Sequence, residues 1–423
     1  MKVMVVGGGG REHAIIKKIK ESPKVDEIYA LPGNGGIAAD ATCVNIGAED
    51  LDAIVDFAKV NKMDFAVVAP DDPLVMGLVD MLEDKGIPCF GPHKDAAIIE
   101  GSKAFAKDLM KKYGIPTAQY EVFTEMEPAL KYVEDCKIPV VVKADGLAKG
   151  KGVIIAEDRD TARNAVESMM EDKMFGDSGS CVVIEEFLTG PEVSVLSFTD
   201  GKTLIPMVSS MDHKRAQDGD KGLNTGGMGT IAPNPYYTQE IADQCEEEIF
   251  LPTMIAMNRE NRSFSGCLYF GLMLTEEGPK VIEYNCRFGD PETQVVLPLL
   301  DSDLMDIFLH VSRGTLSSAK VSFAKDAACC VVMATKGYPG SYGKGYPISI
   351  PEDVKNVYVA GATVEADGSL RSNGGRVLGV TERGSDIREA IDKAYKSVEK
   401  ISFEDGFYRH DIGQKALKAM EGK

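Results

Sequence analysis

A segment rich in glycine and lysine lies between two apolar runs at 140–144 and 153–156. Lys143 and Lys151 lie toward the two ends of this segment. Because glycine lets the backbone approach a ligand closely and lysine supplies positive charge, the segment can lie over a polyphosphate. It does not fit a Walker A loop, in which the two glycines are one residue further apart and a helix follows. By itself the segment is equally consistent with a solvated hairpin.

A polar stripe continues the apolar strand expected at 280–284. Glu283 and Asn285 are two residues apart, so on a strand they share one face with their Cα atoms roughly 7 Å apart. Carboxylate and amide oxygens suit Mg²⁺, which completes its coordination shell with phosphates and water. Arg287 follows on the same face, where its planar fork could bind a phosphate or a carboxylate through two hydrogen bonds. The alternative is an edge strand with a solvated polar face.

The chain begins with an apolar strand, four glycines at 7–10 and a helix that opens at Arg11. In this arrangement backbone N–H groups and the helix dipole face an anion. A dinucleotide fingerprint fits poorly, because Glu12 or His13 falls where the last glycine is needed and no acidic residue closes the second strand. We favour the phosphate of a smaller ligand, and the alternative is a tight strand–helix turn that binds nothing. Residues 32–36 could add a second wall or form an ordinary turn.

A strand-like run at 182–188 ends in two glutamates, Glu185 and Glu186. Its backbone groups could hydrogen-bond an adenine edge, while Glu192 could bind the ribose hydroxyl groups. The apolar Phe187 and Leu188 fit a hydrophobic core better than a ligand contact.

Residues 211–229 are polar and dense in glycine. A loop of this length is often functional, although a disordered surface loop is the alternative. Met228 fits a core position.

Three domains are expected around these residues. Up to Gly101, short apolar runs alternate with helical periodicity, which predicts a doubly wound parallel sheet with ligands at the carboxyl ends of its strands. A helix from Ser102 should end at Gly114, where glycine permits the stop. Strand-like runs and one helix between 117 and 192 predict a small α+β module, and the longer strands after 193 predict the larger half of a cleft.

The C-terminal part begins near Ala327. It carries turn chemistry at 373–375 and ends with a helix whose apolar face begins at Ile387 and whose N-cap is expected to be Ser385.

The composition favours a cytoplasmic protein. With 47 basic and 66 acidic residues the net charge is −19, so the chain lacks the basic surface of a general nucleic-acid or anionic-membrane binder. The first residues form an apolar strand rather than a charged leader, and no run of about 18 apolar residues occurs. Nine scattered cysteines without a C-x-x-C pair predict reduced, mostly buried thiols and no structural zinc site. Cys329 and Cys330 should point to opposite faces of one strand.

Six motifs, taken in order, closely resemble the glycinamide ribonucleotide synthetases (phosphoribosylamine–glycine ligases) of the ATP-grasp superfamily. They are Val6 to His13, Pro32-Gly33-Asn34, Gly101 to Phe105, Lys143 to Val153, Asp212 to Gly229 and Asn285 to Gln294. The resemblance spans essentially the whole chain and implies an α/β architecture. Its parts are a doubly wound phosphoribosylamine-binding domain at 1–101, an ATP-grasp core at 102–326 with a small α+β lid at about 117–192, and an α+β C-terminal domain at 327–423.

The resemblance also implies roles for individual residues. ATP is expected to contact Lys103, Lys143, Lys151, Glu185, Glu186, Phe187, Leu188 and Glu192, and Mg²⁺ or Mn²⁺ to bind Glu283 and Asn285. The catalytic residues implied are Lys143, Arg287 and Asp290. The substrates are expected to contact Gly8, Gly9, Gly10, Arg11, Gly33, Asn34, Asp71, Asp212, Lys214, Asn224, Thr225, Gly226 and Arg287. Asp71, Leu223 and Cys286 stand where the family usually has Glu, Pro and Ala, and none of these changes removes a charged group needed for catalysis.

The implied reaction is the second step of purine biosynthesis. The carboxylate of glycine attacks the γ-phosphoryl group of ATP, and the amine of 5-phosphoribosylamine then displaces phosphate from glycyl phosphate. We expect a monomer that binds these small molecules and neither nucleic acid nor membrane. The alternatives are another ATP-grasp carboxylase or carboxylate–amine ligase, and a non-catalytic nucleotide-binding or regulatory protein. A ligase requires Lys143 and Glu283 to meet in one cleft.

Overall fold

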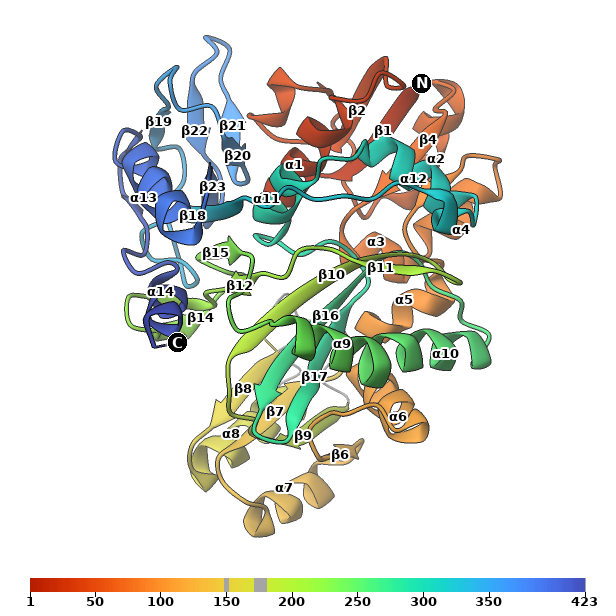
Figure 1. Cartoon of the computed structure of the whole chain (residues 1–423), viewed down its shortest axis with the longest axis vertical. Helices are drawn as coiled ribbons and strands as arrows, with labels where there is room; N and C mark the ends of the chain where they lie inside the picture. The colour runs from red at the N-terminus through yellow and green to blue at the C-terminus, as the bar shows by residue number, and fades with distance from the viewer. Residues whose placement is uncertain (148–151, 171–180, 423) are drawn as a thin grey trace.

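The computed structural model describes residues 1–147, 152–170 and 181–422. Lys151, one of the residues expected to bind ATP, lies outside these ranges. Figure 1 shows the N-terminal and C-terminal parts at one end of the molecule and the small sheet of residues 120–186 at the other. All nine cysteines are free thiols. Among the described helices, none is long and apolar enough to cross a membrane.

The N-terminal part is a parallel five-stranded sheet in the order β3-β2-β1-β4-β5. Its strands are β1 (Lys2–Gly7), β2 (Glu27–Pro32), β3 (Thr42–Cys43), β4 (Phe65–Val68) and β5 (Cys89–Phe90). Its helices are α1 (Gly10–Ile19), a 3-10 turn (Ile37–Ala39), α2 (Leu51–Val60), α3 (Asp71–Met76), α4 (Leu78–Glu83) and α5 (Lys94–Gly101). Every residue of β4 is buried, as expected for a central strand covered on both faces. The predicted doubly wound sheet is confirmed.

A smaller antiparallel sheet follows in the order β6-β9-β7-β8. It consists of β6 (Tyr120–Phe123), β7 (Val140–Ala144), β8 (Val153–Ala156) and β9 (Val182–Glu186), with α7 (Met126–Asp135) and α8 (Arg159–Met170). Val140, Val142 and Ile184 pack against these two helices. Because side chains alternate along a strand, Lys143 and Glu185 lie on the opposite face of the sheet. The sheet therefore presents these two charged groups away from its own core.

The central sheet is antiparallel and has the order β11-β10-β16-β17. Its strands are β10 (Glu192–Asp200), β11 (Leu204–Pro206), β16 (Ser265–Thr275) and β17 (Gly278–Asn285). The helices around it are α6 (Lys103–Tyr113), α9 (Gln239–Cys245), a π-helical turn (Glu246–Phe250), α10 (Leu251–Arg259), α11 (Thr293–Val296), a 3-10 turn (Leu297–Leu299) and α12 (Leu304–Ser312). Met4 and Val68 of the N-terminal sheet share one hydrophobic core with Phe270 and Leu272 of β16, so these two sheets form a single packed body.

The last large sheet has the order β12-β15-β18-β23-β20, with β25 paired to β18. Its strands are β12 (Met211–Asp212), β15 (Gly229–Ala232), β18 (Ala327–Thr335), β20 (Val357–Val359), β23 (Arg376–Gly384) and β25 (Gly406–Phe407). Beside it lie a sheet of β19 (Pro347–Ser349), β21 (Ala362–Val364), β22 (Leu370–Ser372) and β24 (Ser402–Phe403), and the helices α13 (Ile387–Val398) and α14 (Gln414–Glu421). A 3-10 turn (Leu316–Ser318) packs against α12 of the central part. Two strands of this C-terminal sheet thus come from the segment before residue 233.

Residues 211–229, expected to form a loop, instead contain β12, the hairpin β13 (Arg215–Gln217) and β14 (Lys221–Asn224), and the start of β15. β15 pairs with the fully buried β18, so long-range pairing overrides the polar, glycine-rich composition. The predicted cap of α13 is also wrong. Asp386 is the N-cap and accepts a hydrogen bond from the N–H group of Glu389, while Ser385 donates its hydroxyl to the Glu389 carboxylate.

Candidate active site

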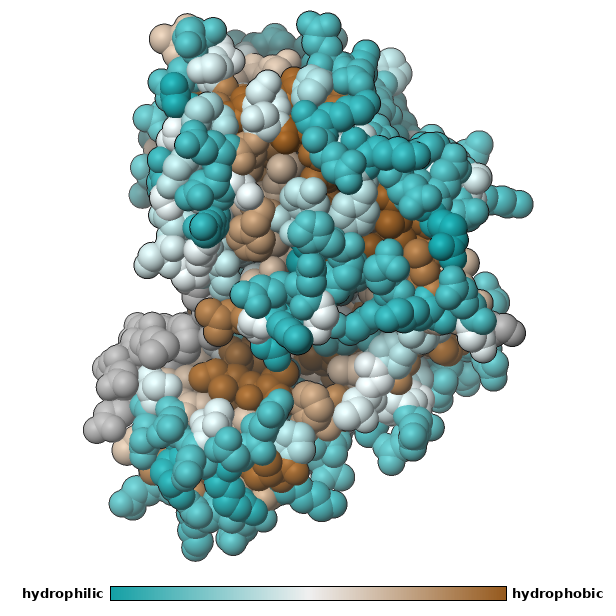
Figure 2. Space-filling model, turned by 90° about the vertical axis from the view of Figure 1, so that its left-hand side faces the viewer, coloured by the Kyte–Doolittle hydropathy of each residue, from teal (hydrophilic) through white to brown (hydrophobic). Residues whose placement is uncertain are grey.

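The small sheet and the central sheet meet through a lysine. Lys143 of β7 donates a hydrogen bond to the carbonyl oxygen of Ile282 in β17 (Nζ to O 3.3 Å), and Ile282 directly precedes Glu283. Lys143 and Glu283 therefore share one cleft, which the predicted ligase required. Figure 2 shows the molecule hollowed between the small lobe and the larger body, with apolar surface exposed in the hollow.

Positive charge surrounds Glu283. Lys214 Nζ lies 3.7 Å from Glu283 Oε1 and 3.2 Å from Glu192 Oε2. Burial raises the pKa of the Glu283 carboxyl, but the charges of Lys214, Lys143 and Lys103 outweigh it and lower the pKa overall. Glu283 is therefore ionised and lies among three of the lysines that the sequence assigned to ATP or substrate.

Lys103 lies at the start of α6, directly after the N-cap Ser102. Its ammonium group donates to the carbonyl oxygen of Gly146 (2.6 Å), in the glycine- and lysine-rich segment. Asp145 accepts a further hydrogen bond from the N–H of Ala104 (2.9 Å). The first part of the glycine-rich segment is thus fastened to the helix that carries Lys103.

A buried carboxylate holds Lys143 in place. Glu185, 3% exposed, forms one ion pair with Lys143 and another with Lys107. Burial lowers the pKa of Lys107 to about 8, although the negative charge of Glu185 opposes this shift. Glu185 was expected to contact adenine, and Lys107 was not among the predicted site residues. The spacing of four residues between Lys103 and Lys107 could have indicated the second lysine, because it places both lysines on one face of α6.

The burial of the segment expected to contact adenine differs in part from the prediction. Phe187, expected in the core, is 38% exposed, because β9 ends at Glu186 and the chain leaves the sheet there. Leu188 is half-buried, and Met228 is buried as predicted. Glu186 Oε1 accepts a hydrogen bond from the N–H of Gln119 (3.1 Å).

Asn285 and Arg287 meet on one carboxylate. Glu100, near the end of α5, accepts a hydrogen bond from Asn285 Nδ2 at 2.9 Å and pairs with Arg287 at 2.8 Å. A second carboxylate, that of Asp71, lies 3.9 Å from Arg287. The charges of Arg287 and Arg11 lower the pKa of Asp71 despite the opposing effect of burial. Glu100 was not among the predicted site residues, although it directly precedes the motif at 101–105.

The two expected metal ligands suit a divalent ion bound mainly through phosphates. The side chain of Glu283 is 35% exposed. Since the amide nitrogen of Asn285 donates to Glu100, its oxygen is the atom available to a metal. Within the described ranges no group of three or more His, Cys, Asp and Glu residues could hold a metal by itself. Two protein oxygens fit the few direct ligands that Mg²⁺ takes from proteins beside nucleotide phosphates.

The turn at 7–10 is closely packed against the protein. A Cβ atom on Gly8 would lie 2.4 Å from the carbonyl oxygen of Gly33, which only glycine avoids. The N–H of Gly9 donates to Glu12 Oε2 (2.6 Å), and that of Arg11 to Asp290 Oδ2 (3.2 Å). Two carboxylates of the protein thus lie at the start of α1, where a ligand phosphate was expected.

Asn34, expected to contact substrate, is engaged within the protein. Its Nδ2 donates to the carbonyl oxygens of Gly8 (2.9 Å) and Val359 (2.7 Å), and its Oδ1 accepts from the N–H groups of Gly36 and Ile37 (both 2.9 Å). This amide fastens the N-terminal turn to β20 of the C-terminal part.

The C-terminal part adds an arginine to the site. Arg376 NH1 donates to the carbonyl oxygens of Gly226 and Asp290 (both 2.8 Å) and lies 3.5 Å from the Asp290 carboxylate. The N–H of Thr225 donates to the carbonyl oxygen of Lys214 (2.8 Å). Asn224 is paired with Arg215 in the hairpin of β13 and β14. Arg376 follows the turn at 373–375, and only the folded chain brings it to residues 226 and 290.

Two carboxyl groups lie beside Lys214. Burial, followed by the charge of Glu292, raises the pKa of Asp212 well above its usual value, and burial raises that of Glu292. Tyr269 donates its hydroxyl to Glu292 (3.1 Å). A Cβ on Gly227 would lie 2.6 Å from Asp212 Oδ1, so glycine is required beside this carboxyl group. Glu292 was not among the predicted residues.

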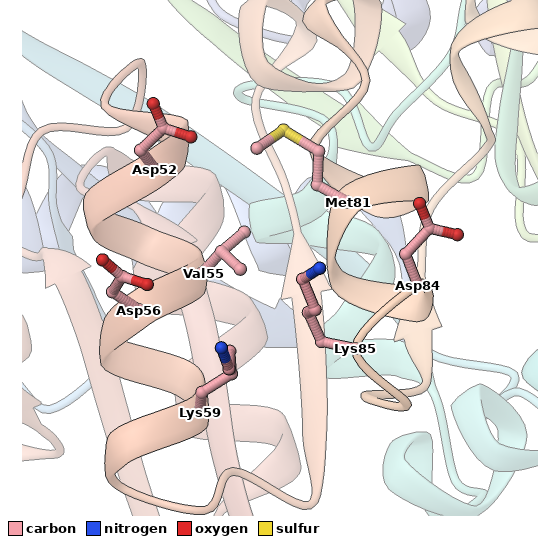
Figure 3. A pocket seen from close by; sticks show the side chains of 7 residues that line it. All are labelled: Asp52, Val55, Asp56, Lys59, Met81, Asp84 and Lys85. Atoms are coloured by element: carbon pink, nitrogen blue, oxygen red, sulfur yellow. The ribbon is translucent and has the colours of Figure 1, made fainter.

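A surface pocket of about 330 Å³ lies away from these groups, between α2 and α4. Figure 3 shows the residues that line it: Asp52, Val55, Asp56, Lys59, Met81, Asp84 and Lys85. It contains none of the predicted site residues.

Three family models match successive parts of the chain. "Phosphoribosylglycinamide synthetase, N domain" matches residues 1–100, the "ATP-grasp (A) domain" of the same family matches 101–293, and its "C domain" matches 328–415.

Curated relatives match along almost their whole length. A phosphoribosylamine–glycine ligase of Caldanaerobacter subterraneus is 48% identical over 414 residues, which cover 97% of this chain and 99% of the relative. One of Halalkalibacterium halodurans is 49% identical over 420 residues, which cover 99% and 97%.

Solved structures agree with this architecture. The phosphoribosylamine–glycine ligase of Thermotoga maritima has a TM-score of 0.86 and 36% identity, covering 97% of this chain and 100% of that one. The biotin carboxylase domain of Hydrogenobacter thermophilus 2-oxoglutarate carboxylase has a TM-score of 0.74 with 15% identity, covering 96% and 91%. At that identity the second likeness shows the fold alone.

Proposed function

This chain belongs to the phosphoribosylglycinamide synthetase family, and from that membership we propose that it joins glycine to 5-phosphoribosylamine while ATP is converted to ADP and phosphate. The chain is thus an ATP-grasp ligase of the second step of purine biosynthesis. The observation that carries the proposal is the contact between Lys143 and the strand of Glu283, which lets lysines and a carboxylate–amide pair act on one triphosphate.

ATP would lie between the small sheet and the central sheet. In this proposal Lys103 and Lys143 bind its phosphates, the segment 185–188 binds adenine, and Glu192 binds the ribose. The positions of Lys103, Lys143 and Glu192 beside the cleft support these roles. Glu283 and Asn285 would hold Mg²⁺ or Mn²⁺, which neutralises negative charge on the phosphates when bound. Phosphoryl transfer depends on positioning and charge neutralisation, so this set needs no covalent nucleophile.

Glycine would lie between Arg287 and the carboxyl groups of Asp212 and Glu292. The buried Nε of Arg287 has no hydrogen-bond partner among the described residues, so it can donate to the glycine carboxylate and to the acyl phosphate. The glycine ammonium group would pair with Asp212 and Glu292. Burial raises the pKa of both carboxyl groups, and the charge of Glu292 raises that of Asp212 further.

In the first step a carboxylate oxygen of glycine attacks the γ-phosphorus, which gives glycyl phosphate and ADP. In the second, the amine of 5-phosphoribosylamine attacks the acyl carbon, phosphate leaves, and the nitrogen loses one proton. Closure over the cleft would exclude water, which otherwise hydrolyses an acyl phosphate.

The sugar phosphate would lie on the N-terminal side, near residues 8–11 and Asp71. Asp290 joins this region to the C-terminal part, because it contacts both the N–H of Arg11 and the guanidinium of Arg376. To bind at the start of α1, the phosphate has to use the donors left by Glu12 and Asp290 or displace one of these carboxylates.

We also propose domain boundaries near residues 101 and 327, with residues 211–232 crossing into the C-terminal sheet. A monomer, a cytoplasmic location and the absence of nucleic-acid or membrane partners stay predictions. The acidic net charge of −19 supports the last of these.

An assay of ADP release tests the function. ADP should form only when glycine and 5-phosphoribosylamine are both present, and the product should be glycinamide ribonucleotide. Because the fold is shared with a biotin carboxylase domain, a second reaction should contain bicarbonate in place of glycine. ADP formed equally well with bicarbonate or another carboxylic acid would overturn the proposed substrates.

A further inference from the structure

Glu100 is a buried carboxylate that three consecutive residues share. It is 8% exposed and lies one residue before the end of α5. Oε1 accepts from Asn285 Nδ2 (2.9 Å) and pairs with Arg287 NH2 (2.8 Å), while Oε2 accepts from the N–H of Cys286 (2.7 Å). One side chain of the N-terminal part thus binds the whole stretch from the end of β17 to Arg287.

These contacts determine which way the Asn285 amide faces. Oε1 of Glu100 also faces the guanidinium of Arg287, so this oxygen acts as a hydrogen-bond acceptor. The Asn285 amide must therefore turn its nitrogen, and not its oxygen, toward Glu100. The amide oxygen then points away from Glu100. That oxygen is the atom through which Asn285 would bind a divalent metal.

The backbone contact has a separate effect. β17 ends at Asn285, so the buried N–H of Cys286 lies past the end of the strand, and Glu100 satisfies it. Just beyond Glu100, Ser102 caps α6 and Lys103 begins it. The same short segment therefore places Lys103 and the end of β17 relative to each other.

We propose that Glu100 is a positioning residue of the nucleotide site. It holds the oxygen of Asn285 toward the metal of the bound nucleotide and holds Arg287 toward the transferring group. Outer residues that orient a metal ligand typically contribute about 10- to 100-fold to metal affinity. The inference deepens the proposed function and rests on it.

A charge-conserving exchange tests this role. In Glu100→Gln, one amide oxygen replaces two carboxylate oxygens. When that oxygen accepts from the N–H of Cys286, the Gln nitrogen faces Asn285 Nδ2, and the Asn285 amide loses its acceptor. In Asn285→Asp, two carboxylates face each other. In the double variant Glu100→Gln/Asn285→Asp, the Gln nitrogen donates to the Asp carboxylate, and the negative charge stays beside Arg287. Asp95→Asn, on the exposed side of α5, is the control.

The measurement is binding of Mn²⁺ together with ADP to the whole protein, followed by electron paramagnetic resonance and calorimetry. Each single variant should weaken Mn²⁺ binding by about 10-fold or more. The double variant should return to within about threefold of the wild type, since the hydrogen bond is restored with reversed polarity. Asp95→Asn should bind like the wild type.

Two results would overturn the inference. In the first, the Glu100→Gln variant binds Mn²⁺ and ADP as tightly as the wild type does. In the second, the double variant binds Mn²⁺ no more tightly than the weaker-binding single variant. Circular dichroism and melting temperature identify a single variant that fails to fold, and the double variant still decides the question in that case. Wild-type protein that binds Mn²⁺ and ADP but does not ligate glycine would refute the proposed substrates alone. Wild-type protein that does not bind Mn²⁺ with ADP would refute both.

Discussion

The ammonium group of Lys143 lies 3.3 Å from the backbone oxygen of Ile282. This contact joins β7 of the small sheet to β17 of the central sheet, one residue before Glu283. Glu185 and Lys107 form a buried ion-pair chain behind Lys143, so the position of the Lys143 charge in the cleft also depends on these two residues.

Replacing Glu283 with alanine should lower kcat by at least about 100-fold, since it removes a group that orients charge at the transferring phosphoryl. The dependence on Mg²⁺ should change as well, with a higher concentration needed for half-maximal rate. Steady-state kinetics at a series of Mg²⁺ concentrations measures both effects. Glu276→Ala, in the exposed turn between β16 and β17, is the matched control. Unchanged Mg²⁺ dependence in Glu283→Ala would remove this residue from the metal site.

Replacing Lys107 with methionine leaves Glu185 buried with one cationic partner in place of two. Breaking a buried ion pair in this way costs about 3–5 kcal/mol of stability. Urea unfolding should show a lower midpoint with little change in slope. Lys111→Met, on the exposed side of the same helix, should change the free energy of unfolding by less than about 0.5 kcal/mol. Equal midpoints for the two variants would show that the Lys107 pair contributes nothing net.

Arg376→Ala removes the group that holds residues 226 and 290 together. Because small displacements of binding groups cost catalysis heavily, kcat/KM for glycine should fall by about 10- to 100-fold. This loss in kcat/KM should be much larger than the loss in affinity for ADP alone, which calorimetry measures. Arg383→Ala, on the same strand but bound to Pro298 and Asp326, should behave as the wild type. A similar loss in both variants would indicate general damage to β23.

Stability should fall as the pH is lowered from about 6.5 to 4 because of His213. This imidazole is 3% exposed, lies 3.1 Å from the carbonyl oxygen of Gly229, and accepts from the N–H of Gly413 at 3.1 Å. Burial, with the nearby charge of Arg409, lowers its pKa from 6.5 to about 4. Above pH 6.5 the imidazole is neutral in both states, and between 6.5 and 4 only the unfolded chain takes up the proton. The free energy of unfolding should therefore drop by roughly 3 kcal/mol across this window.

Urea unfolding at several pH values measures that drop. His213→Asn should flatten the dependence between pH 6.5 and 4, whatever its effect on stability at pH 8. A wild-type slope retained in His213→Asn would assign the transition to other groups.

Much of the architecture follows from local patterns. The alternation of short apolar strands with helices up to Gly101 predicted the parallel sheet, and Ser102 and Gly114 marked the ends of α6 correctly. The spacing of Glu283 and Asn285 put both on one face of a strand, and the ordered motifs led to the family. These features depend on the repeat of side chains along helices and strands and on the residues of short loops. Both are determined by residues that are close together in the sequence.

Predictions from local sequence patterns were wrong where contacts between distant residues determine the structure. The segment 211–229 became strands because β18, a hundred residues later, pairs with it, and Phe187 is exposed because β9 ends one residue earlier. At α13, Ser385 and Asp386 are both suitable caps, and only the backbone geometry selects Asp386.

The sequence by itself determined the three-part architecture, the family and most of the groups that carry charge into the cleft. The tertiary structure alone decided which residues position these groups. Glu185 with Lys107 positions Lys143, Glu100 positions Asn285, and Arg376 contacts Asp290. The physical reason is that an ion pair or a hydrogen bond depends on distance in space. Partners such as Glu100 and Asn285 are 185 residues apart along the chain, where no local period relates them.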